Sequence, residues 1–300
     1  MNAVLRVEHL QKRYGSFTAV EDVSLSVEDG EIFGILGPNG AGKTTTVECL
    51  QGLRFADGGE LSVLGHDPRR EAKQLRRRIG SQLQESALPD RIKVREALEF
   101  FSTLTPNGPD SVTVMEQWGL AEKRDATFGS LSGGQQQRLF VALAVVNAPE
   151  LVFLDEMTTG LDPSSRRVAW GLIRQIRDRG ATVVLVTHFM DEAENLCDRL
   201  AVIADRRVVA IDTPDGLVDR YAGEAKVTFS TDATNVGFLE QVDGVEGVEH
   251  SGRRVAVKGH GAVLANVAAA LVARGPAPTD LQVRRGNLED AFLRITGEET

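Results

Sequence analysis

A glycine-rich segment near residue 40 has the residues of a phosphate-binding loop. The sequence GPNGAGKT at positions 37–44 matches the spacing G-x-x-x-x-G-K-[ST], between an apolar run and a helix-forming stretch. Its glycines let successive backbone N–H groups face an anion, and the start of a helix adds its positive dipole end. Lys43 would reach the β and γ phosphates, and the Thr44 hydroxyl would bind Mg²⁺. The candidate binding residues are Gly37, Pro38, Asn39, Gly40, Ala41, Gly42, Lys43, Thr44 and Thr45.

Two carboxylates end an apolar run farther along the chain, in LVFLDE at positions 151–156. Asp155, at the carboxyl end of a buried strand, can hold Mg²⁺ directly or through water beside the phosphate loop. Glu156 can then lie near the γ phosphate as a general base or water-positioning group. A strand that simply reaches solvent is the alternative, and the phosphate loop on the same chain favours the catalytic interpretation.

The segment LSGGQ at positions 131–135 could present a helix N-terminus to an anion. Ser132 can cap a helix over about 133–147, and Gly133 and Gly134 expose its first N–H groups. In this order along the chain, the segment resembles the signature of the ATP-binding cassette (ABC) family, the ATPase subunits of ABC transporters. The resemblance covers about the first 215 residues and implies a P-loop NTPase fold that binds ATP and Mg²⁺.

The resemblance gives roles to further positions. Tyr14, in KRYG, matches an aromatic residue that stacks on adenine. Gln84, in IGSQLQ, matches a glutamine that contacts Mg²⁺ and couples to the membrane partner, and Gln82 is its near rival. Asp162, in TGLD, matches the loop where two subunits meet. His188, in LVTHFMDEAE, matches a histidine that contacts the γ phosphate, although a lone histidine could also cap the next helix.

Met157, in DEMTTGLD, departs from the family pattern, which usually has proline there. Since this position supplies no phosphate contact in the family, we expect a change in local stiffness and none in chemistry. The catalytic and metal positions are all retained: Glu156, His188 and Gln84 for catalysis, and Thr44, Gln84 and Asp155 for Mg²⁺.

These residues need a scaffold of parallel strands covered by helices. Apolar runs at 31–36, 151–155, 181–187 and 200–204 are typical of strands buried on both faces. Residues 3–8 and 23–28 alternate apolar and polar side chains, which predicts a half-exposed antiparallel piece. Helical stretches near 93–104 and 111–120 predict a helical subdomain over about 85–150. The expected fold is α/β, with the cassette over residues 1–215.

The pattern of predicted strands and helices changes after Asp212. Strand-like runs at 226–230, 253–259 and 280–285 alternate with a helix over 261–274, and a last helix opens at Asn287 with one apolar face. We therefore expect a small accessory α+β domain over 216–300. The run GNLEDAFLRITG at 286–297 resembles the tail of ATPase subunits of multidrug exporters of the daunorubicin-resistance type.

Composition and charge limit the possible classes. The 300 residues are 42% hydrophobic and 26% charged, an ordinary globular mixture. The net charge of −9 disfavours non-specific nucleic-acid binding, although six cations within 69–78 could contact a headgroup or nucleic acid if they were not a solvated helix face. No run approaches the roughly 18 apolar residues of a membrane span, and no secretory signal opens the sequence. Two cysteines, Cys49 and Cys197, favour a reducing compartment.

The resemblance implies that one chain cannot close its own site. ATP is expected between the phosphate loop of one copy and a second cassette, in a homodimer or a mixed pair, which supplies Ser132, Gly133, Gly134 and Gln135. The expected function is ATP hydrolysis that powers export through a separate membrane permease, which docks near Gln84 and the helical subdomain. The chain would lie at the cytoplasmic face of the cell membrane, and no nucleic-acid partner is expected.

Three alternatives remain at this point: an importer ATPase, a soluble ABC ATPase that acts on ribosomes or DNA, and a regulator without turnover. A single cassette disfavours the translation factors, and the short distance between phosphate loop and signature leaves no room for the coiled coil of chromosomal members. The presence of Glu156 and His188 disfavours a regulator without turnover.

Overall fold

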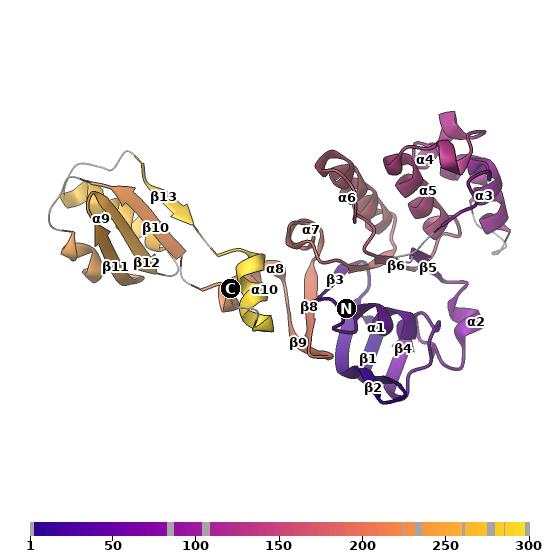
Figure 1. Cartoon of the computed structure of the whole chain (residues 1–300), viewed down its shortest axis with the longest axis horizontal. Coiled ribbons are helices and arrows are strands. Elements are labelled where there is room, and N and C mark those ends of the chain that lie inside the picture. Colours follow the sequence, from indigo (N-terminus) through magenta and orange to yellow (C-terminus); the bar gives the residue numbers. More distant parts are fainter. Residues whose placement is uncertain are drawn as a thin grey trace. The chain divides into compact units, whose positions relative to one another are not determined.

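The chain forms two compact units, Met1–Asp215 and Gly216–Thr300. The computed structural model, drawn in Figure 1, describes residues 3–82, 87–103, 109–223, 225–231, 236–259, 262–274, 280–284 and 286–297. Each unit has its own sheet and its own cluster of buried apolar side chains.

A nine-stranded sheet in the order β4-β1-β2-β9-β8-β3-β7-β6-β5 forms the centre of the first unit. Neighbouring strands are parallel from β8 to β5, and β1 pairs antiparallel with both β2 and β4. The strands are β1 (Ala3–Tyr14), β2 (Phe17–Glu28), β3 (Ile32–Leu36), β4 (Gly58–Val63), β5 (Ile79–Gln82), β6 (Leu151–Asp155), β7 (Thr182–Val186), β8 (Arg199–Ala204) and β9 (Arg207–Asp212). The predicted α/β class is confirmed, and β3, β6 and β7 are buried along their whole length.

Helices of the first unit connect these strands. They are α1 (Lys43–Leu50), α2 (Ala72–Leu75), α3 (Val94–Ser102), α4 (Ser111–Gln117), α5 (Gly133–Val145), α6 (Pro163–Asp178) and α7 (Met190–Leu196), with 3₁₀ turns η1 (Ala121–Lys123) and η2 (Phe128–Ser130). Figure 1 shows α3, α4 and α5 grouped together on one side, away from β1, β2 and β4. The helices predicted near 93–104 and 111–120 are observed, each somewhat shorter.

Two strands are longer than the sequence pattern predicts, and two others were not predicted from it. β1 and β2 each continue for 12 residues, because Tyr14 pairs with Phe17 across a tight hairpin that extends the ladder beyond the alternating segments. β4 and β9 were not predicted. β4 buries only two side chains, and β9, although it contains the apolar run VVAI, buries only one.

The second unit is a four-stranded antiparallel sheet in the order β11-β12-β10-β13, with α9 packed against it. Its elements are α8 (Pro214–Tyr221), β10 (Ala225–Ser230), η3 (Gly237–Gln241), β11 (Val245–Ser251), β12 (Arg254–Gly259), α9 (Val263–Arg274), β13 (Gln282–Arg284) and α10 (Leu288–Thr296). The predicted opening of the last helix is confirmed: the Asn287 side chain accepts the Asp290 amide at 2.8 Å. β11 was not predicted, because its side chains are at most half-buried and a register shift interrupts their alternation.

Candidate functional site

The phosphate loop, residues 37–44, connects the end of β3 to the start of α1. Gly42 stands at the N-cap of α1 with φ 97°, and a Cβ there would lie 2.4 Å from the Ala19 carbonyl oxygen. At the other end of the loop, a Cβ on Gly37 would lie 2.2 Å from the Ile203 carbonyl oxygen. Both glycines are therefore needed so that the loop backbone can lie directly against the neighbouring strands.

Lys43 lies inside this loop and is only 6% exposed. Its Nζ donates hydrogen bonds to the carbonyl oxygens of Gly37 at 2.8 Å and Pro38 at 3.0 Å. Burial lowers the pKa of this amine, while the negative charges of Glu156 and Asp155 oppose that shift. The arrangement keeps an ammonium group in the loop, with carbonyl contacts that phosphate oxygens can replace.

Three neighbouring strands bring the predicted catalytic groups to one edge of the sheet. Val186 on β7 pairs with both Ile35 on β3 and Asp155 on β6, and all three strands are parallel. Their carboxyl ends therefore lie side by side, where functional groups of open α/β sheets usually gather. The phosphate loop and Glu156 directly follow the ends of β3 and β6, and His188 is the second residue after the end of β7.

Asp155 is a buried carboxylate, 3% exposed. Burial, with help from the charge of Glu156, raises its pKa to about 6, although a hydrogen bond with the Thr44 side chain opposes the shift. Within the described residues, its Oδ1 atom has no hydrogen-bond partner. A buried carboxylate oxygen without a partner is costly, so a cation is a suitable ligand for it. A carboxylate beside a hydroxyl is also a donor set that Mg²⁺ prefers, so Asp155 and Thr44 fit the predicted metal role.

Glu156 and His188 face each other at this edge. The Glu156 Oε1 and His188 Nδ1 atoms are 3.5 Å apart. Glu156 has φ 48°, which is uncommon for a residue with a side chain, and its backbone N–H donates to the Val186 carbonyl oxygen at 2.9 Å. Backbone strain of this kind concentrates at functional sites, where surrounding structure maintains it. The sheet thus brings these two predicted catalytic residues together.

The signature segment, residues 131–135, lies at the start of α5. Ser132 is the N-cap residue, as predicted, and the Gln135 Oε1 atom accepts its backbone N–H at 3.0 Å. A hollow of about 460 Å³ opens between α5 and α6, and none of its lining residues belongs to the phosphate loop. Its lining includes Ser132, Gly133, Gly134, Gln135, Gly160 and Asp162. The signature segment and the loop before α6 therefore line the same hollow.

Asp162 has a structural task that the sequence analysis did not assign. It is the N-cap of α6, and its Oδ1 accepts the backbone N–H groups of Ser164 at 2.9 Å and Ser165 at 3.1 Å. The two serine hydroxyls donate to the same carboxylate, and these hydrogen bonds hold its pKa below the usual range. The sequence D-P-S-S, with proline at the first helical position, is the signal that predicts this cap.

Of the two remaining predicted residues, the structure describes Tyr14 and does not describe Gln84. Tyr14 ends β1, is 40% exposed, and has the cations of Lys12 and Arg54 within 5.2 and 5.6 Å of its ring centroid. Gln84 lies outside the described residues. Its rival Gln82, on β5, is buried, and its Oε1 accepts a hydrogen bond from the Gln137 amide at 3.3 Å.

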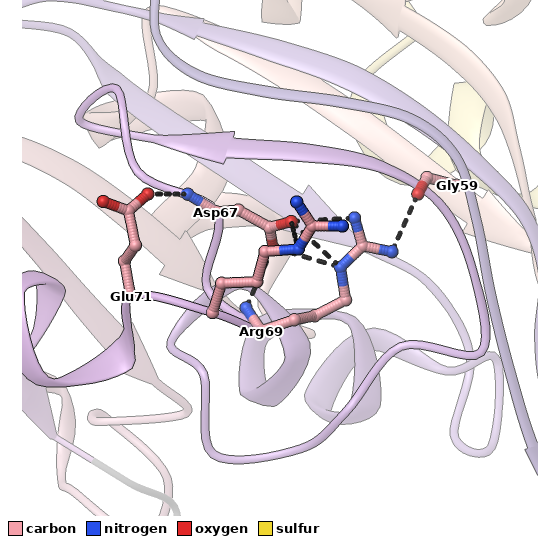
Figure 2. Close-up of polar contacts among 5 residues, drawn as sticks. Gly59, Asp67, Arg69 and Glu71 are labelled. Carbon is pink, nitrogen blue, oxygen red and sulfur yellow. Dashed lines mark hydrogen bonds and ion pairs between the residues drawn. The ribbon is translucent and has the colours of Figure 1, made fainter.

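Four arginines of the basic segment 69–78 contact the protein itself, among them Arg70, whose Nε lies 3.9 Å from Asp67 Oδ2. Figure 2 shows Arg69 bound to Asp67 and to the Gly59 carbonyl oxygen, with Glu71 accepting the Asp67 amide. Arg78 pairs with Glu150, and Arg76 donates to a backbone carbonyl oxygen. These arginines therefore help to hold the turns around α2. Separately, none of the helices in the described ranges has the length and apolar character to cross a membrane.

Comparisons with known proteins agree with this geometry. A family model described as ABC transporter matches residues 20–159. The chain is 36% identical over 308 residues to the daunorubicin resistance ATP-binding protein DrrA2 of Streptomyces coeruleorubidus, covering 99% of this chain and 96% of that protein. It is 37% identical over 305 residues to the Nod factor export ATP-binding protein I of Burkholderia pseudomallei (strain 1710b), covering 99% and 98%.

A solved ATP-binding subunit of an ABC transporter superposes with a TM-score of 0.65 and 25% identity, covering 72% of this chain and 92% of the other. The family resemblance and the P-loop NTPase fold predicted from the sequence are thereby confirmed. With its phosphate loop, signature segment and carboxylates arranged as described, this chain belongs to the ABC transporter family as an ATP-binding subunit.

Proposed function

We propose that this chain binds and hydrolyses ATP with Mg²⁺ in a site shared by two cassettes, and that hydrolysis powers export through a separate membrane permease. The observation that supports this most strongly is the convergence of Lys43, Asp155, Glu156 and His188 at the carboxyl edge of β3, β6 and β7. Each of these groups suits a different part of a Mg²⁺-bound triphosphate.

In the proposed mechanism, Lys43 exchanges its two carbonyl contacts for oxygens of the β and γ phosphates. Thr44 and Asp155 would hold Mg²⁺, which would supply positive charge to the phosphate oxygens. Glu156 accepts the proton of the attacking water, and His188, 3.5 Å from it, orients that carboxylate and contacts the γ phosphate. Tyr14 offers a half-exposed ring for stacking on adenine.

The second half of the site would come from another cassette. Ser132, Gly133 and Gly134, at the start of α5, line the hollow beside α6, whose lining contains no phosphate-loop residue. A helix N-terminus of this kind stabilises an anion, so it suits the γ phosphate of a nucleotide held by a second copy. ATP would thereby close the pair and hydrolysis would reopen it, as a population shift driven by differential binding.

Export is supported by the functions for which the relatives are named. The two proteins compared above are named for daunorubicin resistance and for Nod factor export, and both align over nearly the whole chain. We infer the same direction of transport here, with the chain at the cytoplasmic face of the membrane and bound to its permease.

The shared site can be tested by mixing two inactive variants, Lys43→Ala and Ser132→Arg. Lys43→Ala should weaken nucleotide binding, because it removes a charged contact to the phosphates. Ser132→Arg should leave that binding intact and block closure, because it places a bulky cation at the start of α5. In a mixed dimer one site carries both changes and the other carries none, so mixing should restore ATPase activity that neither variant shows alone.

The assay uses the full chain together with its permease, with mixed dimers verified by two different affinity tags. Wild type mixed with each variant measures whether one intact site can turn over. If it can, and the verified mixture of the two variants remains inactive, the shared site is wrong.

A further inference from the structure

The contact with Glu156 alone restrains the His188 side chain only weakly. That side chain is 39% exposed, and its Nδ1 atom lies 3.5 Å from the Glu156 Oε1 atom, which is long for a polar contact. An exposed side chain changes rotamer rapidly unless packing restrains it. An imidazole that must face a carboxylate and a phosphate therefore depends on a further contact that fixes its ring.

That further contact comes from the next residue in the chain. The ring centroids of His188 and Phe189 are 4.1 Å apart, and the ring planes make an angle of 39°. Phe189 is the N-cap residue of α7, so its backbone is fixed on both sides. Its N–H donates to the Thr187 Oγ1 atom at 3.0 Å, and its carbonyl oxygen accepts the Ala193 N–H at 3.1 Å. The phenyl ring thus packs against the imidazole from an anchored position.

Arg166, near the start of α6, lies over the Phe189 ring. Its guanidinium carbon is 4.0 Å from the ring centroid, a distance at which a cation is attracted to an aromatic face. Its Nη1 atom is also 3.2 Å from the Asp191 Oδ2 atom on α7. The Arg166 side chain is only 20% exposed, and partial burial strengthens electrostatic contacts of this kind. The guanidinium therefore holds the phenyl ring between α6 and the start of α7.

We propose that Phe189 is a positioning residue that keeps the His188 imidazole turned toward Glu156. Arg166 fixes the phenyl ring in this arrangement. The inference rests on the proposed function, because it assumes that His188 acts in ATP hydrolysis. Its physical basis is that a side chain acts efficiently only when packing holds it close to its productive geometry. Neither Phe189 nor Arg166 belongs to the phosphate loop, so the affinity for ADP, which has no γ phosphate, should not depend on them.

The test is a double-mutant cycle between Phe189 and His188, measured on the full chain together with its permease. Phe189→Leu removes the ring and keeps an apolar side chain, whereas Phe189→Tyr keeps the ring. Each change is made in the wild-type chain and in His188→Ala. Single-turnover hydrolysis of radiolabelled ATP, followed for hours, measures the rate constant of the chemical step even in slow variants. If Phe189 acts through His188, its effect must disappear when the imidazole is absent.

We expect Phe189→Leu to lower this rate constant about 10-fold in the wild-type chain and to leave the affinity for ADP unchanged. Phe189→Tyr should retain most of the rate. In His188→Ala, Phe189→Leu should cause no further loss. The matched control is Phe238→Leu in the second unit, where the Arg274 guanidinium carbon lies 5.2 Å from the Phe238 ring centroid. This control removes a similar contact and should leave the rate constant unchanged.

Arg166→Leu gives a second test that leaves both rings in place, and it keeps the inference testable if Phe189→Leu does not fold. It should lower the rate constant about threefold, because the phenyl ring loses the cation over its face. This loss should also disappear in His188→Ala.

A purely structural role would give a different pattern. Equal losses from Phe189→Leu, or from Arg166→Leu, in the wild-type chain and in His188→Ala would overturn the inference. A normal rate in Phe189→Leu, or an equal loss in Phe238→Leu, would overturn it as well.

Glu156→Gln, assayed in parallel, separates this inference from the proposed function. It should retain ATP affinity and lose at least about 10²-fold in turnover. If it turns over normally, the proposed function fails and the inference fails with it. If it is inactive while Phe189→Leu or His188→Ala hydrolyses ATP normally, only the positioning of His188 fails.

Discussion

At the residue scale, this site contains two acids with different surroundings. Asp155 is buried beside Thr44 and carries a raised pKa, whereas Glu156 adopts a strained backbone conformation that aims its carboxylate at His188. Environments that distinguish neighbouring carboxylates are a common way to give them separate roles. Here the buried acid suits a metal ion, and its neighbour suits proton transfer.

Asp155 should make Mg²⁺-dependent ATP binding sensitive to pH. Its pKa of about 6 lies above the ordinary 3.8, so the folded chain holds more protons than the unfolded chain between these values. The contribution of this group to stability therefore declines as the pH rises through that window, and it is lowest above pH 6. Mg²⁺ needs the ionised carboxylate, so the gain in ATP affinity from Mg²⁺ should shrink as the pH falls from about 7.5 to about 5.5.

Calorimetric titration of ATP, with and without Mg²⁺ at both pH values, measures this gain. Asp155→Asn is the control for protonation of the nucleotide itself. In this variant Mg²⁺ should raise the ATP affinity little at either pH. Without ligand, Asp155→Asn should also melt at a higher temperature than wild type, by a larger margin at the higher pH. A Mg²⁺ gain that does not change with pH in wild type would contradict the assignment.

At the element scale, the group of α3, α4 and α5 is the expected docking region for the permease. Phe100, on α3, is 60% exposed, and its ring lies 5.6 Å from that of Phe101 in an edge-to-face pair. An exposed phenylalanine on a short helix, packed against a partly buried one, is a suitable contact for an amphipathic helix from a partner, because aromatic side chains often dominate such interfaces.

Phe100→Glu should weaken association with the permease and leave the ATP affinity of the isolated chain unchanged. The physical reason is that a charge replaces an exposed apolar side chain on α3, which carries none of the proposed nucleotide-binding residues. Phe55→Glu is the matched control, because Phe55 is 71% exposed in the same unit but lies outside α3, α4 and α5. Co-purification with the membrane protein measures the effect, and equal losses in both variants would exclude a specific docking role for Phe100.

At the scale of the whole molecule, the two units have separate apolar cores. The first lies between the large sheet and its helices, and the second joins α9 to the four-stranded sheet. The proposed nucleotide-binding residues all belong to the first unit, so ligand binding and the stability of the second unit should be separable.

Scanning calorimetry should resolve two transitions. ATP with Mg²⁺ should raise only the transition of Met1–Asp215, because ligands stabilise the unit that binds them. Phe229→Ala should lower only the other one, since Phe229 is 1% exposed in the second core and its truncation costs about 3–5 kcal/mol. A single transition that responds to both changes would contradict this independence.

Local spacing was sufficient to identify the candidate residues for phosphate and metal binding. The phosphate loop, the signature segment and the carboxylates after β6 are contiguous motifs, so residues 37–44, 131–135, Asp155 and Glu156 could be identified without a structure. The strands that carry them are apolar runs, which predict buried parallel strands for the same reason. Asn287 was predicted as a helix start because capping is also a local interaction.

Tertiary structure decided whatever depends on segments that are distant in the sequence. The pairing of β3, β7 and β6 places Glu156 beside His188, and the approach of α6 and α7 gives Glu192 its partner Trp170. The edge strands β4 and β11 were missed because their weak burial leaves no pattern, and only pairing with neighbours makes them strands. A glutamate in a helical segment gives no sign of burial by itself; its environment is created only when those elements come together.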